Sequence, residues 1–151
     1  MKILLAIDGS SYSEAAVAEV SWRPWPAQSE VRLITVDPPL DANLLRGGSP
    51  TAFDDLVKRQ RSEAARRLSD AAAVLQQNCP GLPVTPVLRE GWPKEVILDE
   101  AERWGADLIV IGSHGYGAIK RLFLGSVSLA VAANASCSVE IVRGPDQPAK
   151  G

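Results

Sequence analysis

Short apolar runs recur along this chain, and each is bounded by glycine, proline or charged residues. Runs that are too short for a helix and almost wholly apolar predict strands that are covered on both faces. Five such strands are expected: Ile3–Ile7, Val31–Val36, Val84–Leu88, Leu108–Ile111 and Val139–Arg143. Pro86 interrupts the third, which favours a place at the edge of a sheet for that strand.

The stretch after the first strand carries the signals of a helix. Ser11 and Glu14 have the spacing of a capping box, in which each side chain accepts a hydrogen bond from the other end of the first turn. The helix is expected to continue to Val20. The two prolines within Trp22–Pro26 end it, because proline cannot continue a helix interior.

The longest predicted helix covers Thr51–Asn78, and a shorter one covers Lys94–Trp104 with Pro93 near its first position. The apolar residues of the long helix keep to one stripe at steps of three, four or seven: Phe53, Val57, Ala64, Leu68, Ala71 and Leu75. Its basic residues are Lys58, Arg59, Arg61, Arg66 and Arg67. Acidic residues interleave with them, which favours a solvated helix face over an anion-binding patch.

Strands that alternate with helices predict a single doubly wound α/β domain. Its parallel sheet should have helices on both faces and right-handed crossovers. Ligands of such sheets bind beyond the carboxyl ends of the strands, where the winding reverses. The residues just after each strand are therefore the first candidates for a site.

A glycine-rich stretch follows the fourth strand. Gly112, Gly115, Gly117 and Gly125 form a loop, and beyond Gly125 a last helix is predicted from apolar residues at steps of four: Val127, Val131 and Ala135. A phosphate could bind here, because backbone N–H groups approach an anion closely where no Cβ blocks them. A helix N-terminus adds unsatisfied donors, and Ser126 and Ser128 add hydroxyl groups. Ordinary turns are the alternative use of such glycines.

Composition narrows the classes of function. The 151 residues carry 16 basic and 18 acidic side chains, a net charge of −2, so no basic field exists for nucleic acid or an anionic membrane. No apolar run reaches the roughly 20 residues of a membrane span, and Asp8-Gly9 interrupts any signal peptide. Cys79 and Cys137 are expected to be buried or idle thiols. A cytoplasmic protein is expected.

Several catalytic patterns are missing from the sequence. It has neither a Gly-x4-Gly-Lys-Ser/Thr loop nor a Gly-x-Gly-x-x-Gly after the first strand, and it has no Gly-x-Ser-x-Gly elbow. His114 is the single histidine, which argues against a metal cluster or a histidine-based triad. A site that binds phosphates without an evident base or nucleophile is typical of a binding module.

The spacing Gly112-x2-Gly115-x9-Gly125-Ser126 resembles the nucleotide-binding motif of the universal stress protein family, in its ATP-binding branch. Lys2–Ser10 is similar to the opening strand and turn of that family. Glu90–Ile97 and Gly105–Gly115 are similar to its third helix and fourth strand. The resemblance extends over residues 2–143 and leaves residues 144–151 as a polar tail, expected to be disordered.

The resemblance implies the strand order 3-2-1-4-5, which brings Asp8 and Gly112 to one crevice. It also implies that Asp8 contacts an adenine nucleotide and its Mg²⁺, although Asp8 could instead cap the turn before the first helix. Val36 is chosen by analogy as the strand end whose backbone meets the adenine. The implied nucleotide-binding set is Asp8, Val36, Gly112, His114, Gly115, Gly125, Ser126, Val127 and Ser128. His114 could equally be a solvated side chain. Lys120 and Arg121 lie between the third and fourth glycines, where a cation could reach the terminal phosphate, but solvent exposure is favoured for both.

The resemblance further implies a homodimer that pairs through strand 139–143. Two positions depart from the family pattern: Ser138 replaces a usual proline, and Glu140 a usual apolar residue. Glu140 could face its own copy across the two-fold axis, and Arg143 of the other chain could relieve that repulsion. A dimer weaker than is usual for the family is therefore expected.

The function that these observations predict is that of an ATP-binding (or AMP- or ADP-binding) stress-response module with at most slow hydrolysis. Two alternatives stay open. One is a slow nucleotide hydrolase or transferase that uses His114. The other is a stress protein that binds no nucleotide and acts through protein contacts, although branches without ATP generally lack the final Gly125-Ser126.

Overall fold

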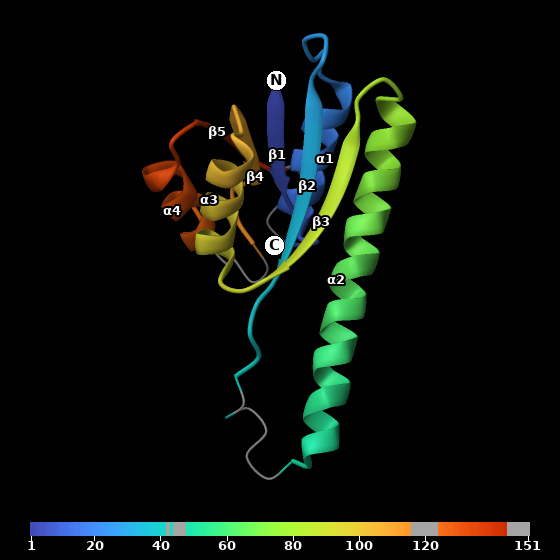
Figure 1. Ribbon diagram of the computed structural model, residues 1–151, viewed down its shortest axis with the longest axis vertical. Coiled ribbons are helices and arrows are strands. Elements are labelled where there is room, and N and C mark those ends of the chain that lie inside the picture. The colour runs from blue at the N-terminus through green and yellow to red at the C-terminus, as the bar shows by residue number, and fades with distance from the viewer. Residues whose placement is uncertain (42, 44–47, 116–123, 145–151) are drawn as a thin grey trace, which may run out of the picture.

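The computed structural model describes residues 1–41, 43, 48–115 and 124–144, and it shows a five-stranded parallel sheet between two layers of helices (Figure 1). The strands are β1 (Lys2–Ala6), β2 (Glu30–Asp37), β3 (Val84–Glu90), β4 (Leu108–Gly112) and β5 (Ser138–Val142). The helices are α1 (Ser11–Trp22), α2 (Pro50–Asn78), α3 (Pro93–Trp104) and α4 (Ser126–Asn134). The sheet order β3-β2-β1-β4-β5 confirms the predicted α/β class and strand order.

Two apolar cores sandwich the sheet. Successive residues of a strand point to opposite faces, so Ile3 and Leu5 of β1 join the core beneath α1 and α2, while Leu4 and Ala6 join the core beneath α3 and α4. These side chains are almost fully buried. Helices on both faces explain why residues 3–6 of β1 and residues 108–111 of β4 are apolar without a break rather than at alternate positions.

Most predicted element boundaries are correct to within one or two residues, but the predicted N-cap of α1 is wrong. Ser10, not Ser11, is the N-cap, and its side chain accepts a hydrogen bond from the Ser13 N–H at 3.2 Å. Gly9 takes a left-handed φ of 81°, and the Ser10 N–H donates to the Asp8 carboxylate at 2.9 Å. This tight turn places the cap one residue early, so Ser13 rather than Glu14 completes the cap.

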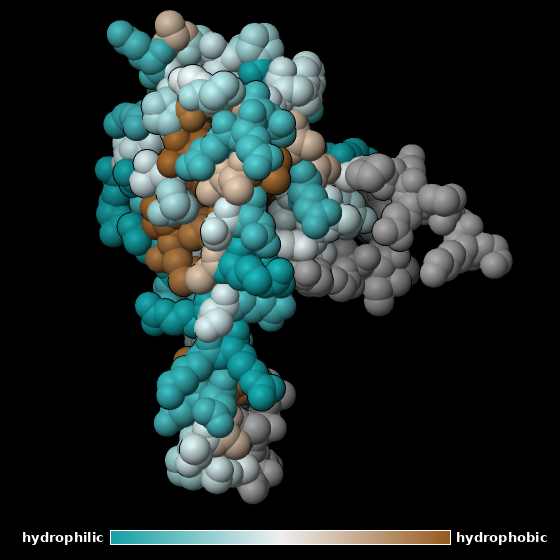
Figure 2. Space-filling model, turned by 90° about the vertical axis from the view of Figure 1, so that its right-hand side faces the viewer, coloured by the Kyte–Doolittle hydropathy of each residue, from teal (hydrophilic) through white to brown (hydrophobic). Residues whose placement is uncertain are grey.

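Helix α2 extends beyond the sheet. Its 29 residues span about 43 Å, whereas the eight residues of β2 span about 26 Å. The lower part of α2 in Figure 1 accordingly passes the carboxyl edge of the sheet. Ala64, Leu68 and Leu75 of the predicted apolar stripe are buried, but Val57 lies on the overhang and is 37% exposed. Figure 2 looks onto the α2 side and shows a mainly hydrophilic surface.

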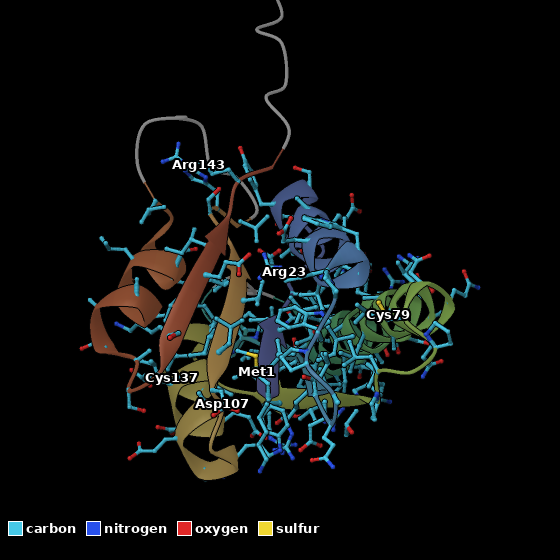
Figure 3. The ribbon with its side chains drawn as sticks, turned by 90° about the horizontal axis from the view of Figure 1, so that it is seen from above. Met1, Arg23, Cys79, Asp107, Cys137 and Arg143 are labelled. Atoms are coloured by element: carbon cyan, nitrogen blue, oxygen red, sulfur yellow. The ribbon has the colours of Figure 1, made fainter. Side chains whose placement is uncertain are left out.

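Glu140 has a partner within its own chain that the sequence did not indicate. The side chain of Glu140 lies on the α1 side of β5, where Arg23 holds it with two hydrogen bonds of 2.6 and 2.7 Å. Arg23 also pairs with Glu19. Figure 3 shows Arg23 between α1 and the two strands β4 and β5. The charge of Glu140 is therefore balanced within its own chain, without Arg143 of another copy.

Glu100 on α3 is a buried carboxylate that holds three arginines. Its oxygens accept from Arg32 at 2.6 Å, Arg89 at 3.1 Å and Arg103 at 3.2 Å, and only 3% of its side chain is exposed. Burial raises the pKa of Glu100, but the hydrogen bonds and charges of Arg32 and Arg89 outweigh burial and hold the pKa below the ordinary value of 4.5. Arg32 also lies over the ring of Trp104, 4.4 Å from its centre.

The two cysteines are half-buried and unpaired. The thiol of Cys79 donates to the Ser21 carbonyl at 2.7 Å, and Figure 3 shows Cys137 on the opposite side of the molecule. Burial raises the pKa of the Cys137 thiol, which lowers its reactivity. Among the helices of the described ranges, none is long and apolar enough to cross a membrane.

Candidate functional site

A cleft of about 770 Å³ opens at the carboxyl ends of β1, β2 and β4, where the winding of the sheet reverses. Segments from all parts of the chain line it: Ala6–Asp8, Ser13, Ile34–Pro38, Gln60, Ala64, Arg67, Pro93, Ile97, Ile111, Gly112, His114, Gly115 and Leu124–Ser128. Its volume is within the range of small-molecule sites. All nine sequence-predicted site residues are thus brought to one place.

Gly112 at the end of β4 and Gly115 in the loop beyond it both pack closely against residues near the end of β1 and the start of α1. A Cβ on Gly112 would lie 2.7 Å from the backbone carbon of Tyr12 in α1, a distance that real Cβ atoms do not adopt. A Cβ on Gly115 would lie 2.8 Å from a carboxylate oxygen of Asp8. A side chain at Gly112 would have to displace the backbone of α1, whereas one at Gly115 would displace the end of the Asp8 side chain.

Gly125 is the N-cap of α4, and its φ of −61° is open to any residue. Backbone angles therefore do not require glycine at this position. A Cβ at Gly125 would instead lie 3.2 Å from Cα of His114, within the Gly112–Gly115 loop. The Gly125 N–H donates to the Ser113 carbonyl at 2.8 Å, which joins the loop to the helix. Gly125 has no side chain to cap the helix, so no side-chain cap takes up the first N–H groups of α4 within the described residues.

The two serines of α4 differ in what they can offer a ligand. Ser126 is exposed at the first position of the helix and lines the cleft. Ser128 is 3% exposed, and its hydroxyl donates to the Gly112 carbonyl at 2.6 Å. In this conformation the hydroxyl proton of Ser128 is engaged in a hydrogen bond that joins α4 to the end of β4. Val127 is half-buried against the core beneath α3 and α4 while also lining the cleft.

Asp8 has the geometry of both roles considered for it. One carboxylate oxygen caps the turn by accepting the Ser10 N–H, and the other faces Gly115. The turn-capping role is therefore present in the structure. Contact with a nucleotide stays a prediction, since the same carboxylate also lines the cleft.

His114 is held in place at the rim of the glycine loop. Its ring stacks at a tilt on Tyr12, with 4.9 Å between centroids, and its Nδ1 lies 3.1 Å from the Ser113 hydroxyl. Its Nε2 is buried and has no hydrogen-bond partner among the described residues. A buried polar atom without a partner is costly, so a ligand or water at this nitrogen would stabilise the site.

The backbone of Val36 is presented to the cleft by the early end of β1. In a parallel strand the N–H and C=O groups of alternate residues point to the same side. Ile34 accepts from the Ile7 N–H at 2.9 Å, so the groups of Val36 point toward β1 as well. Since β1 has ended there, the Val36 N–H and C=O have no backbone partner within the described parts of the chain.

Sequence reasoning missed a third wall of the cleft, which α2 supplies. Gln60, Ala64 and Arg67 lie at steps of four and three on one face of this helix, and all three line the cleft. Gln60 donates to the Asp37 carboxylate and to the Pro38 carbonyl. The spacing of Gln60 and Arg67 from Ala64, a residue of the predicted apolar stripe, could have placed both on the inner face of α2. The alternating charges along α2 favoured a solvated face instead.

Gly117, Lys120 and Arg121, which were considered in the sequence, lie outside the described residues, as does the tail beyond Gly144. A metal centre made by protein alone is not present in the described ranges, where no three His, Cys, Asp or Glu side chains cluster. The cleft thus offers single polar groups and backbone donors rather than a preformed cage.

The fold and site define a doubly wound α/β protein with a cleft at the switch point of the sheet. The chain belongs to the universal stress protein family, whose family model matches residues 1–143. A universal stress protein of Thermus aquaticus, encoded in the 3′ region of a QAH/OAS sulfhydrylase, is 35% identical over 142 residues, which are 93% of this chain and 97% of the relative.

Solved structures show the same fold. A universal stress protein family member from Arabidopsis thaliana, determined with AMP bound, superposes with a TM-score of 0.73 at 20% identity and covers 99% of this chain and 97% of its own. A universal stress protein in complex with cAMP gives a TM-score of 0.64 at 22% identity, with 95% and 96% coverage. At these identities the likeness establishes the fold.

Proposed function

We propose that this chain is an ATP-binding module of a stress-response or signalling system, without strong catalytic activity. The observation that carries the proposal is the pairing of two kinds of surface in one cleft. At one end, the Val36 N–H and C=O are open between apolar walls. At the other end, the glycine loop and the N-terminus of α4 form a cradle for phosphate.

The open backbone pair of Val36 suits adenine. Adenine presents a ring acceptor beside an exocyclic amino group, so one N–H and one C=O of a strand end can bind its edge together. Ile97 and Pro93 supply apolar surface for the base from α3. The two neighbours with AMP and cAMP support an adenine nucleotide as the ligand class.

Binding rather than turnover is favoured by the arrangement around His114. Its Nδ1 is directed at Ser113 and its ring is stacked on Tyr12. Within the described residues, no acidic side chain forms a hydrogen bond with Nδ1 or Nε2 of His114. His114 therefore lacks there the orienting partner of a typical general base. Steady-state phosphate release that is lost in His114→Ala would favour a slow hydrolase instead.

The proposal is tested by identifying and titrating the nucleotide. Mass spectrometry of ligand released from freshly purified protein should find an adenine nucleotide, and calorimetry should measure ATP binding. Gly125→Val should weaken ATP binding tenfold or more, about 1.4 kcal/mol, because the side chain would push the Gly112–Gly115 loop away from α4.

Gly81→Val is the matched control, since a Cβ at Gly81 meets nothing within 4 Å. It should bind ATP as the wild type does. Wild-type protein that binds no adenine nucleotide would refute the proposal. Equal affinity in Gly125→Val and wild type would place the phosphates away from α4.

Mg²⁺ fits the site only together with phosphates. Mg²⁺ is commonly held by one or two carboxylates plus substrate phosphates, and Asp8 provides one carboxylate that faces Gly115. When bound, the ion would neutralise phosphate charge beside Asp8. The ATP titrations are therefore run with and without Mg²⁺, and the ion is assigned to the site only if it tightens binding.

We also propose a homodimer that pairs through β5. Both edge strands expose alternate N–H and C=O groups, but on β3 the outward-facing set includes Pro86, which has no N–H. On β5 the outward-facing residues are Val139 and Ile141, followed just past the strand by Arg143, and none of them is a proline. The Arg23–Glu140 pair also keeps the Glu140 charge off this edge.

Ile141→Pro should shift the protein to monomer at concentrations where the wild type is dimeric, because proline removes an outward-facing N–H. Ile141→Ala is the control, since it loses the same side chain but keeps that donor. Sedimentation velocity measures both. A wild type that stays monomeric at high concentration would refute pairing through β5.

The cytoplasmic location expected from the sequence stays a prediction.

A further inference from the structure

Arg67 lines the cleft, whereas the basic residue next to it, Arg66, faces solvent. It continues the face of α2 that begins with Gln60 and Ala64, and 30% of its side chain is exposed. Arg66, one position earlier, is 67% exposed and pairs with Asp70 on the outer face. The α2 helix thus turns one of its five basic side chains within residues 58–67 toward the carboxyl end of β1.

The turn after β1 is shaped to admit Arg67. One guanidinium nitrogen donates to the Asp8 carbonyl at 3.4 Å, and another pairs with Glu63 at 3.2 Å. A Cβ on Gly9 would lie 2.6 Å from Cδ of Arg67, so the arginine stem occupies the space that Gly9 leaves. The guanidinium is therefore adjacent to the same residue whose carboxylate faces Gly115.

Arg67 also matters for the balance of charge in the cleft. Among the described lining residues, Asp8 and Asp37 carry two negative charges and Arg67 is the one lysine or arginine. These two carboxylates would repel an anionic ligand unless a nearby cation offset the repulsion. Arginine suits that purpose, because its planar donor set binds phosphate oxygens in pairs and stays protonated.

We infer that Arg67 binds the phosphate groups of the nucleotide, so that α2 closes the phosphate site opposite the N-terminus of α4. The inference rests on the proposed nucleotide-binding function. Glu63 is 54% exposed and one turn away on the same helix, a position where an ion pair is weak. Arg67 therefore exchanges Glu63 for phosphate when the ligand binds, while its contact with Asp8 keeps it at the strand end.

Calorimetric titration with ATP and with adenosine tests this assignment. Arg67→Gln should weaken ATP binding tenfold or more and change adenosine binding less than twofold, because only ATP has phosphates. Arg67→Lys, which keeps the charge and the stem, should recover part of the ATP affinity. Arg66→Gln is the matched control, since it removes the same charge from the solvent face, and it should leave both affinities unchanged.

Glu63→Gln provides a second measurement in which Arg67 itself is intact. Removing the competing carboxylate should tighten ATP binding by about twofold, the size of an exposed pair one turn apart. A structural role alone would leave ATP binding unchanged or weaken it. Circular dichroism confirms that each variant is folded.

Outcomes separate this inference from the proposed function. Wild-type protein that binds neither ATP nor adenosine would refute the proposed function, and the inference with it. Wild-type binding that Arg67→Gln leaves intact would overturn the inference alone. Equal losses for ATP and adenosine would also overturn it, because Arg67 would then contact the nucleoside or support the fold rather than bind phosphate.

Discussion

Glu100→Gln is expected to lower the free energy of unfolding by about 2 to 3 kcal/mol. Removing one partner of a buried ion pair costs about 3–5 kcal/mol when the other charge stays buried. The expected loss is smaller here because Arg89 and Arg103 are 43% and 68% exposed and regain water, whereas Arg32 is only 25% exposed. Urea unfolding at neutral pH measures the change.

Glu102→Gln is the matched control, since Glu102 is an exposed residue of the same helix and should change stability little. The pH profile gives an independent check. The folded-state pKa of Glu100 is lowered, so its stabilisation is present above its ordinary value of 4.5 and is lost as the pH falls through the folded-state value. The stability gap between wild type and Glu100→Gln should therefore close in acid. A gap that persists there would contradict the ion-pair account.

Gly112→Ala is expected to lower the free energy of unfolding by about 3 kcal/mol, at the upper end of the cost of overpacking. The new methyl group would lie 2.7 Å from the backbone carbon and 2.8 Å from the carbonyl oxygen of Tyr12. Neither atom can move without shifting α1 away from β4. Thermal or urea unfolding measures the loss.

Gly81→Ala is the control for this change, because a Cβ there meets nothing within 4 Å. It should leave stability within about 1 kcal/mol of the wild type, the usual range for a surface glycine. If Gly112→Ala proved as stable as Gly81→Ala and lost only ATP affinity, Gly112 would serve the ligand rather than the contact between α1 and β4.

The glycine motif therefore has two kinds of members. Gly112 and Gly115 are confined by backbone and side-chain atoms of α1 and of Asp8, so they bring the loop to the end of β1. Gly125 takes an ordinary φ and joins the loop to α4. The motif that predicts phosphate binding in the sequence therefore also serves packing, because each of these three glycines lies against another segment of the chain.

Local chemistry was sufficient to predict the elements of this fold. Apolar runs bounded by glycine, proline or charge marked all five strands, and Pro86 marked an edge, because covered strands and edge strands differ in which residues they tolerate. The strand order and the membership of the crevice came from the family resemblance. The N-cap of α1 was missed by one residue, since Gly9 and Asp8 set the turn there.

Contacts between distant segments were decided only by the tertiary structure. Arg67 reads as a surface charge of α2 until the sheet places Asp8 and Gly9 beside it. Glu140 reads as an unpaired charge on an edge strand until Arg23, far earlier in the chain, is packed against it. Periodicity and turn chemistry act over a few residues and are legible in the sequence. The partner of a charge depends on how separate elements pack, so only the folded chain determines it.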